Sequence, residues 1–141
     1  MPSPLENLSG PGKALREEPP DAKEFAGLKR SGLARLADAE KPANSVESRF
    51  DLAYNAAHAL ALAGLRRLGY RAANRYVVFQ VLPHTLGLGA GTWRVLAKCH
   101  GVRNRAEYEG SLEVDGRLVS DLVDSASRVL AALRDKDPVR P

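Results

Sequence analysis

The sequence predicts an all-α protein, an up-and-down bundle of four main helices plus a short helix. Along most of the chain apolar residues recur at intervals of three and four, which is the period of an amphipathic helix. No segment shows a convincing strand pattern. With 141 residues, of which 44% are hydrophobic, the chain can fill one modest core and has little room for a second domain. Antiparallel helices with short connections bury their apolar stripes best as a bundle.

The two ends of the chain differ in composition from the middle. Residues 1–22 hold five prolines and few large apolar groups. Such a segment buries too little surface to offset the entropy cost of ordering, so a flexible or draped N-terminal arm is expected. The bundle is expected over residues 23–134. Residues 135–141 are polar and proline-bearing and are expected to form a C-terminal tail.

The first two helices are predicted from apolar periodicity and from capping residues. The first is expected over residues 23–40, with Pro42 after it. Asn44 or Ser45 can cap the second helix, which is expected over residues 46–68. This helix is the longest and most apolar of the chain, so we expect it at the centre of the bundle.

A shorter helix is predicted next. Gly69 is expected to end the second helix, and Asn74 is suited to cap a helix that runs to about residue 82. Pro83 then lies within or just beyond this helix and is expected to kink it.

The last two helices follow a glycine-rich turn. Residues 87–92 look superficially like a phosphate-binding loop, but they lack the preceding strand and the lysine of such loops, so a turn is expected. Thr92 is expected to cap a helix over residues 93–108, which Gly110 closes. A final helix is expected over residues 114–134.

Composition excludes several kinds of protein. Cys99 is the one cysteine, and the three histidines are scattered, so neither an internal disulfide nor a zinc site is expected. The N-terminus lacks the apolar run of a signal peptide, and no segment reaches the about 20 apolar residues that span a bilayer. A soluble, cytoplasmic protein with no membrane partner and no cofactor is expected.

The net charge of +4 permits contact with nucleic acid without requiring it, because 17 acidic residues are interspersed with 21 basic ones. Basic residues gather in two segments that would form one basic surface if the fold brings them together. They are Arg66, Arg67, Arg71 and Arg75 in the first segment, and Arg94, Lys98, Arg103 and Arg105 in the second.

The most informative stretch is Arg103-Asn104-Arg105-Ala106-Glu107-Tyr108. Helical spacing brings polar groups of this segment to one side of the helix, namely His100, Arg103, Asn104, Glu107 and Tyr108. Guanidinium groups match phosphate oxygens and stay charged at any working pH, so this face can hold a phosphodiester. The alternative is a solvated helix face with an ordinary ion pair between Arg103 and Glu107.

A second polar stripe follows the predicted central helix. Glu47, Asp51, Asn55 and His58 succeed one another by four, four and three residues. If the helix of residues 93–108 packs alongside, Asp51 or Asn55 can pair with the guanidinium of Arg103 and position it. The alternatives are that the stripe faces solvent and that His58 is a packing residue.

These residues resemble the HEPN superfamily of small helical-bundle proteins. The resemblance rests on residues 48–62, on Gly69 and on residues 103–109, and it spans residues 23–134. It implies a dimer whose paired motifs form a shared cleft. Many members are metal-independent endoribonucleases, often toxins encoded beside a minimal nucleotidyltransferase antitoxin.

The family signature is an arginine, commonly followed by Asn, Asp or His, and then a histidine after four to six intervening residues. Arg103 and Asn104 match its first two positions, whereas Tyr108 stands at the nearest place for the histidine. A similar Arg-Asn-x-Ala-Glu-Tyr ending occurs in HEPN-like proteins that are not regarded as nucleases. Histidine carries protons near neutral pH better than a phenol does, and His100 lies one turn before Arg103 as a substitute.

The resemblance therefore implies an RNA-directed dimer, either a metal-independent endoribonuclease or a toxin-like effector. Arg103 is expected to stabilise the phosphorane, with Asn104 orienting it and His100 or Tyr108 carrying protons. The expected supporting residues are Asp51, Asn55, His58, Arg105 and Glu107. Two alternatives stay open: an inactive module that binds RNA, a nucleotide or a partner protein, and a structural adaptor whose Arg103 face makes the dimer contact.

Overall fold

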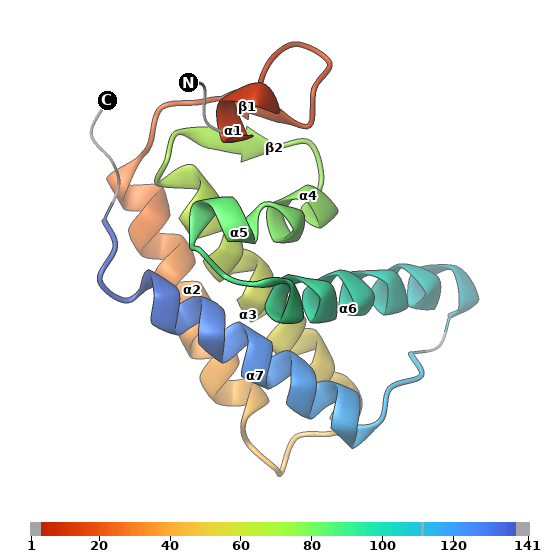
Figure 1. Ribbon diagram of the computed structural model, residues 1–141. Coiled ribbons are helices and arrows are strands. Elements are labelled where there is room, and N and C mark those ends of the chain that lie inside the picture. The colour runs from red at the N-terminus through yellow and green to blue at the C-terminus, as the bar shows by residue number, and fades with distance from the viewer. Residues whose placement is uncertain (1–3, 111, 138–141) are drawn as a thin grey trace.

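The computed structural model describes residues 4–110 and 112–137 and is mostly helical over them (Figure 1). The four long helices are α2 (Ala22–Ala39), α3 (Val46–Arg66), α6 (Ala90–Glu109) and α7 (Gly116–Leu133). Three short helices accompany them, α1 (Pro4–Asn7), α4 (Arg75–Gln80) and α5 (Leu82–Thr85), together with two short strands, β1 (Leu15–Glu17) and β2 (Tyr70–Ala72). The predicted helical class is confirmed at this level. None of the helices in the described part of the chain has the length and apolar character needed to cross a membrane.

The helix α3 lies at the centre of the molecule, as the sequence predicts. Ser45 is its N-cap, because the Ser45 hydroxyl accepts a hydrogen bond from the backbone N–H of Ser48 at 3.2 Å. Asn44, the other predicted cap, donates instead to the carbonyl oxygen of Asp38. Small residues along α3 let its neighbours approach closely, and on α2 a side chain at Gly32 would collide with Leu60.

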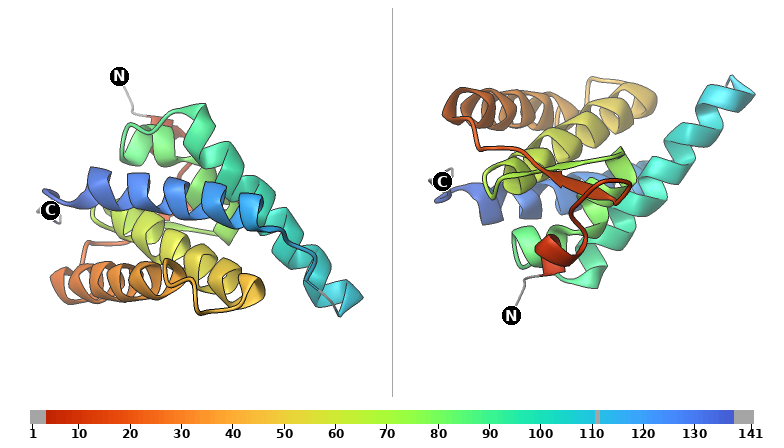
Figure 2. Two further views of the ribbon diagram at one scale, coloured as in Figure 1. Left: turned by 90° about the horizontal axis from the view of Figure 1, so that it is seen from below. Right: turned by 90° about the horizontal axis from the view of Figure 1, so that it is seen from above.

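The four long helices alternate in direction. In the left view of Figure 2, α2 and α6 run one way and α3 and α7 run the other. The helices α2, α3 and α7 lie side by side, and Lys29 on α2 donates to the carbonyl oxygen of Arg134 after α7 at 3.0 Å. The helix α6 is inclined to these three, so its C-terminal part extends beyond them (Figures 1 and 2).

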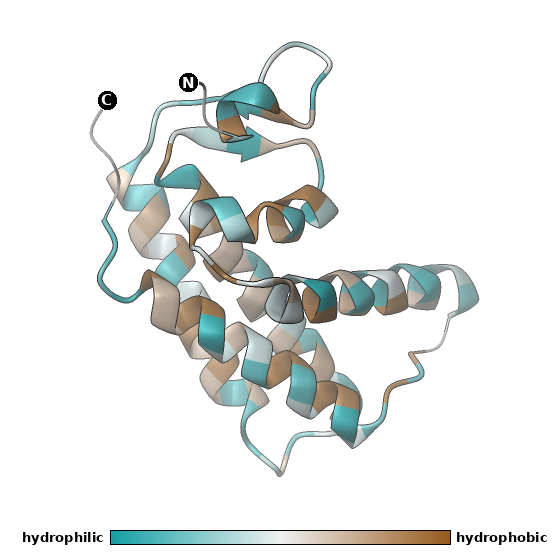
Figure 3. Cartoon of the chain, viewed as in Figure 1, coloured by the Kyte–Doolittle hydropathy of each residue, from teal (hydrophilic) through white to brown (hydrophobic). Residues whose placement is uncertain are grey.

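The helix α6 begins one turn earlier than the sequence predicts. Gly89 is its N-cap, and Thr92 lies buried inside the first turn, so the prediction that Thr92 caps the helix was wrong. The backbone of Gly89 is extended, and Thr92 donates its backbone N–H to the carbonyl oxygen of Gly89 at 3.1 Å, so Thr92 already belongs to the helix. Gly110 ends the helix in the left-handed conformation, with a φ of 74°, which confirms its predicted role. Hydrophilic residues dominate the protruding end (Figure 3).

The predicted short helix is divided in two. Asn74 caps α4, because its side-chain oxygen accepts from the backbone N–H of Val77 at 3.0 Å. The helix ends at Gln80, and Pro83 stands in the first turn of α5, where the missing N–H of proline costs no hydrogen bond. Pro83 thus begins a new helical turn instead of kinking a continuous helix.

The N-terminal segment contains a strand that the sequence did not indicate. In the structure β1 pairs with β2 in antiparallel register, with Leu15 opposite Ala72 and Glu17 opposite Tyr70. The expectation of no strand was therefore wrong, because three-residue strands carry too few positions to show alternation. Leu5 and Leu15 are buried, so residues 4–22 lie draped against the bundle. Of the predicted C-terminal tail, residues 138–141 lie outside the described residues.

A network of charges holds this segment in place. The side chain of Arg66 is 2% exposed and donates to Glu24 Oε1 at 2.6 Å and to the carbonyl oxygens of Glu18 and Pro19 at 2.9 and 2.8 Å. Arg71 donates to the carboxylates of Glu18 and Glu24 at 2.8 and 2.7 Å. Two arginines of the predicted basic surface are engaged in these ion pairs, so their charges are largely neutralised and contribute little to that surface.

Candidate functional site

Side chains from α3, α4 and α6 meet around the ring of Tyr54. Tyr54 lies in the middle of α3 and is fully buried. We use the name Tyr54 cluster for five residues: Tyr54, Arg75 on α4, and His100, Arg103 and Asn104 on α6. The three helices meet because α6 buries Leu96, Cys99 and Val102 in the core, which turns the neighbouring polar positions toward α3 and α4.

His100 is held by a hydrogen bond at each ring nitrogen. Its Nδ1 lies 2.8 Å from the hydroxyl oxygen of Tyr54, and its Nε2 lies 3.1 Å from the amide nitrogen of Asn104. An amide nitrogen can only donate, so Nε2 accepts. The neutral imidazole then carries its proton on Nδ1 and donates it to the oxygen of Tyr54. This arrangement leaves Nε2 as the basic nitrogen, on the side of the exposed Asn104.

Two guanidinium groups lie close to the ring of Tyr54. The Cζ atom of Arg103 is 5.1 Å from the ring centroid, and the Cζ atom of Arg75 is 5.8 Å from it. Both distances are in the range of cation–π attraction, which draws the two charges toward the same buried ring. The fold therefore brings positive charges from α4 and α6 together, although they stand 28 residues apart in the sequence (103 − 75).

The acidic partners of Arg103 are exposed. Arg103 lies 3.3 Å from Glu107 and 3.9 Å from Asp51, and these carboxylates are 64% and 62% exposed. Ion pairs at such exposure contribute little, so they leave the guanidinium able to exchange partners. Arg75 donates to the side-chain oxygen of Asn55 at 3.4 Å, a neutral acceptor at a long distance.

The electrostatics of the cluster keep the imidazole of His100, and that of the neighbouring His58, neutral. Partial burial lowers the pKa of His100 below its ordinary value, and the charges of Arg75 and Arg103 lower it further, against a smaller opposing effect of Glu107. Burial, together with the same charges, lowers the pKa of His58 to about 4. Burial also raises the pKa of Tyr54, an effect that the two arginines oppose. The cluster is therefore positively charged through its arginines and uncharged at His100 near neutral pH.

Several predicted residues come together as the sequence suggests. Asp51 and Arg103 are neighbours, so α3 and α6 meet at the predicted point. Asn55 contacts Arg75 instead of Arg103, and its amide nitrogen donates to the carbonyl oxygen of Asp51 at 2.9 Å. His58 packs edge-on against Phe79, with ring centroids 6.0 Å apart, which fits the packing alternative.

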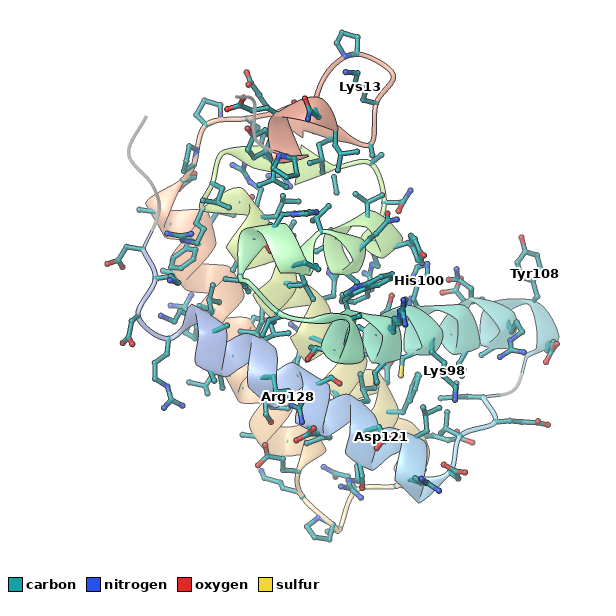
Figure 4. The ribbon with its side chains drawn as sticks, in the orientation of Figure 1. Lys13, Lys98, His100, Tyr108, Asp121 and Arg128 are labelled. Carbon is teal, nitrogen blue, oxygen red and sulfur yellow. The ribbon has the colours of Figure 1, made fainter. Side chains whose placement is uncertain are left out.

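Tyr108 and Arg105 do not reach the cluster. Tyr108 is 94% exposed, because the last turn of α6 has passed beyond the other helices, and Figure 4 shows it projecting from the far end of α6, well apart from His100. Arg105 lies on another side of α6 and lines a depression with Val102 and Glu109. Helical spacing alone placed Tyr108 on the His100 side, and the protrusion of the helix end separates the two.

Two cluster residues were not predicted as part of a site. The sequence places Tyr54 inside the most apolar helix of the chain and Arg75 in a general basic segment. A buried tyrosine hydroxyl needs a hydrogen-bond partner, which is a signal that sequence reasoning can use. Cys99, next to His100, is buried, and burial raises the pKa of its thiol to about 12, so it is a packing residue.

In comparisons with known proteins, no protein-family model, no curated protein and no solved structure matches this chain. Over residues 4–110 and 112–137, no three histidine, cysteine, aspartate or glutamate side chains gather in a way that could hold a metal ion. The geometry of the Tyr54 cluster is therefore the basis for assigning a function.

Proposed function

We propose that this chain is an RNA-directed protein and that the Tyr54 cluster holds a phosphodiester group. The observation that carries the proposal is that Arg75 and Arg103 approach one buried ring, where, among the described residues, the side-chain partners of Arg103 are exposed carboxylates and Arg75 donates to the neutral amide of Asn55. A phosphate has the charge and the oxygen geometry that two guanidinium groups match. Asn104 is exposed beside them and adds an amide for a further hydrogen bond.

RNA is preferred over other phosphate ligands because Arg103 and Asn104 match the start of the HEPN signature. The mostly helical fold is compatible with that resemblance, and we propose the HEPN-like bundle as its architecture. The chain also carries a net charge of +4, which favours association with a polyanion.

A binding titration tests this proposal. The probe is a fluorescent single-stranded oligonucleotide with 2′-O-methyl groups, which prevent cleavage. We expect Arg103→Ala and Arg75→Ala to weaken binding by about tenfold each, because each loses charge-assisted hydrogen bonds to phosphate. Affinity of the wild type is expected to fall steeply with salt.

The matched control is Arg128→Ala, which removes one positive charge from an exposed ion pair with Asp124 on α7. It is expected to bind almost as the wild type does. Equal losses in Arg128→Ala and Arg103→Ala would show that general charge, and not the Tyr54 cluster, attracts the RNA. Circular dichroism confirms that each variant is folded.

Metal-independent RNA cleavage is a second candidate, and the state of His100 favours it. Its lowered pKa keeps Nε2 unprotonated, and once the exposed amide of Asn104 gives up its hydrogen bond, Nε2 can accept the proton of a ribose 2′-hydroxyl. The 2′-oxygen then bonds to phosphorus, the bond to the 5′-oxygen breaks, and the imidazolium returns the proton to that oxygen. Arg75 and Arg103 would stabilise the charged phosphorane.

Incubation of total tRNA with the protein in excess chelator separates the two candidates. Cleavage by the wild type and not by His100→Gln or Arg103→Ala supports the endoribonuclease. RNA that is bound but left intact supports the binding module.

The remaining parts of the proposal concern partners. On the HEPN resemblance we propose a homodimer with a shared cleft and, as a second partner, a nucleotidyltransferase-type antitoxin. Sedimentation of the wild type and of Arg103→Ala tests the dimer. Loss of a dimer in Arg103→Ala, with no binding of RNA by the wild type, would favour the structural adaptor.

A further inference from the structure

We propose that Tyr76 stacks on a nucleobase next to the bound phosphate, so that the Tyr54 cluster takes single-stranded RNA and not duplex RNA. This inference rests on the proposed function, since it places the base that belongs to the same phosphodiester. It adds Tyr76 of α4 to the site, whereas the Arg103-Asn104 motif lies on α6.

Tyr76 lies beside the cluster and is open to solvent. Its side chain is 40% exposed, and its ring centroid is 6.2 Å from that of His100, with the ring planes tilted by 53°. It directly follows Arg75 in the sequence, so the guanidinium and the phenol belong to one helical turn. The side chain of Asn74 caps that turn and fixes its backbone.

The ring of Tyr76 is not part of the hydrophobic core. The buried side of α4 is formed by Val77, Val78 and Phe79, whereas Tyr76 and Gln80, four residues apart, are both exposed. Tyr76 contacts His100 of a cluster that also holds two guanidinium groups. Proteins hold single-stranded nucleic acid with such a combination, in which cations bind the backbone and an aromatic ring stacks on a base.

The geometry of RNA explains the selectivity. In a duplex the bases are stacked on one another, and their faces are closed to side chains, whereas unpaired bases can leave the strand and stack on tyrosine. A phosphate at Arg75 and Arg103 would place its neighbouring nucleotide within reach of α4. The phenol can therefore distinguish a flexible strand from a helix without reading sequence.

The test measures binding of three probes by the wild type, Tyr76→Ala and Tyr76→Phe. The probes are a 2′-O-methyl single strand, the same strand in a duplex, and a strand of equal length without bases. We expect Tyr76→Ala to bind the single strand about tenfold more weakly and the abasic strand as well as the wild type does. Tyr76→Phe is expected to retain the affinity, because its ring still stacks.

Tyr108→Ala is the matched control, because it removes an exposed tyrosine from the far end of α6. Unchanged single-strand affinity in Tyr76→Ala, with affinity lost in Arg103→Ala, would overturn the stacking role and leave the proposed function in place. Wild-type affinity in Arg103→Ala, or no binding of any probe by the wild type, would overturn the proposed function and this inference with it. Equal losses in Tyr76→Ala and Tyr108→Ala would also overturn the stacking role.

Discussion

The hydroxyl oxygen of Tyr54 and the Nδ1 atom of His100 lie 2.8 Å apart, so a fully buried residue of α3 sets the orientation of an imidazole on α6. This bond directs the other nitrogen, Nε2, toward Asn104 and the exposed side of the helix. It also joins α3 to α6 beside the two arginines. Tyr54 thus orients His100 from the buried side of the site.

Replacement of Tyr54 by phenylalanine removes this bond and keeps the ring. We expect Tyr54→Phe to fold and to lose about 1 kcal/mol of unfolding free energy, the usual net value of one hydrogen bond. RNA affinity is expected to fall less than in Arg103→Ala, because the ring that attracts both guanidiniums remains. Urea denaturation measures the loss of stability, and the binding titration measures the RNA affinity. Affinity lost to the same extent in both variants would contradict the supporting role of Tyr54.

Replacement of Asn104 by aspartate changes the charge next to His100. A carboxylate stabilises a protonated Nε2, so the pKa of His100 is expected to rise toward its ordinary value in Asn104→Asp. RNA binding is expected to weaken, because the new negative charge repels phosphate. NMR titration of the imidazole measures the first effect. A pKa of His100 that stays as low as in the wild type would show that Asn104 does not contact the ring.

The lowered pKa of His58 predicts a loss of stability in mild acid. The folded pKa of about 4 lies below the ordinary 6.5, so the unfolded chain binds a proton more readily. The stability due to neutral His58 is complete above pH 6.5 and decreases as the pH falls toward 4. Between pH 7 and 5 we expect a decrease of about 1–2 kcal/mol in the unfolding free energy.

The variant His58→Gln isolates this effect. It is expected to be less stable at pH 7, since the contact with Phe79 is lost, but to show a flatter dependence on pH between 7 and 5. His100 retains part of the slope, because its pKa is lowered too. Urea denaturation at several pH values measures the slopes, and equal slopes in the two proteins would contradict the prediction.

The ion-pair network of Arg66 predicts that removal of one carboxylate lowers the free energy of unfolding. In Glu24→Gln, the guanidinium of Arg66 stays buried next to a neutral amide, and we expect a loss of about 1–2 kcal/mol. The control is Asp124→Asn in the exposed pair with Arg128, where a loss of about 0.5 kcal/mol or less is expected. If Glu24→Gln and Asp124→Asn lose equally little unfolding free energy in thermal or urea denaturation, the network does not stabilise the fold.

Much of the helical framework could be predicted from local signals. Ser45, Asn74 and Gly110 mark helix ends because capping depends on the residue itself and its immediate neighbours. The apolar period of α3 indicates a central helix for the same local reason. By contrast, the pairing of β1 with β2 depends on residues more than 50 positions apart, such as Leu15 and Ala72, and leaves no local pattern.

The candidate site was predicted only in part. Arg103, Asn104 and His100 stand in one segment of sequence, so helical spacing was enough to group them. Arg75 comes from a separate short helix whose position depends on how α4 packs against α6. The prediction that Tyr108 lies beside His100 was wrong for a related reason. Helical periodicity shows which residues share a face, but it does not show where the helix extends beyond the core.

The most direct test of the central claim is an NMR titration of the histidine side chains with the single-stranded 2′-O-methyl oligonucleotide. Three histidines make assignment simple, and His84, exposed on α5, serves as the reference for nonspecific changes. If the Tyr54 cluster holds phosphate, the resonances of His100 shift on binding and its pKa rises, because the anion offsets the charges of Arg75 and Arg103. If His100 is unaffected at a saturating concentration of the oligonucleotide, the Tyr54 cluster is not a phosphodiester site.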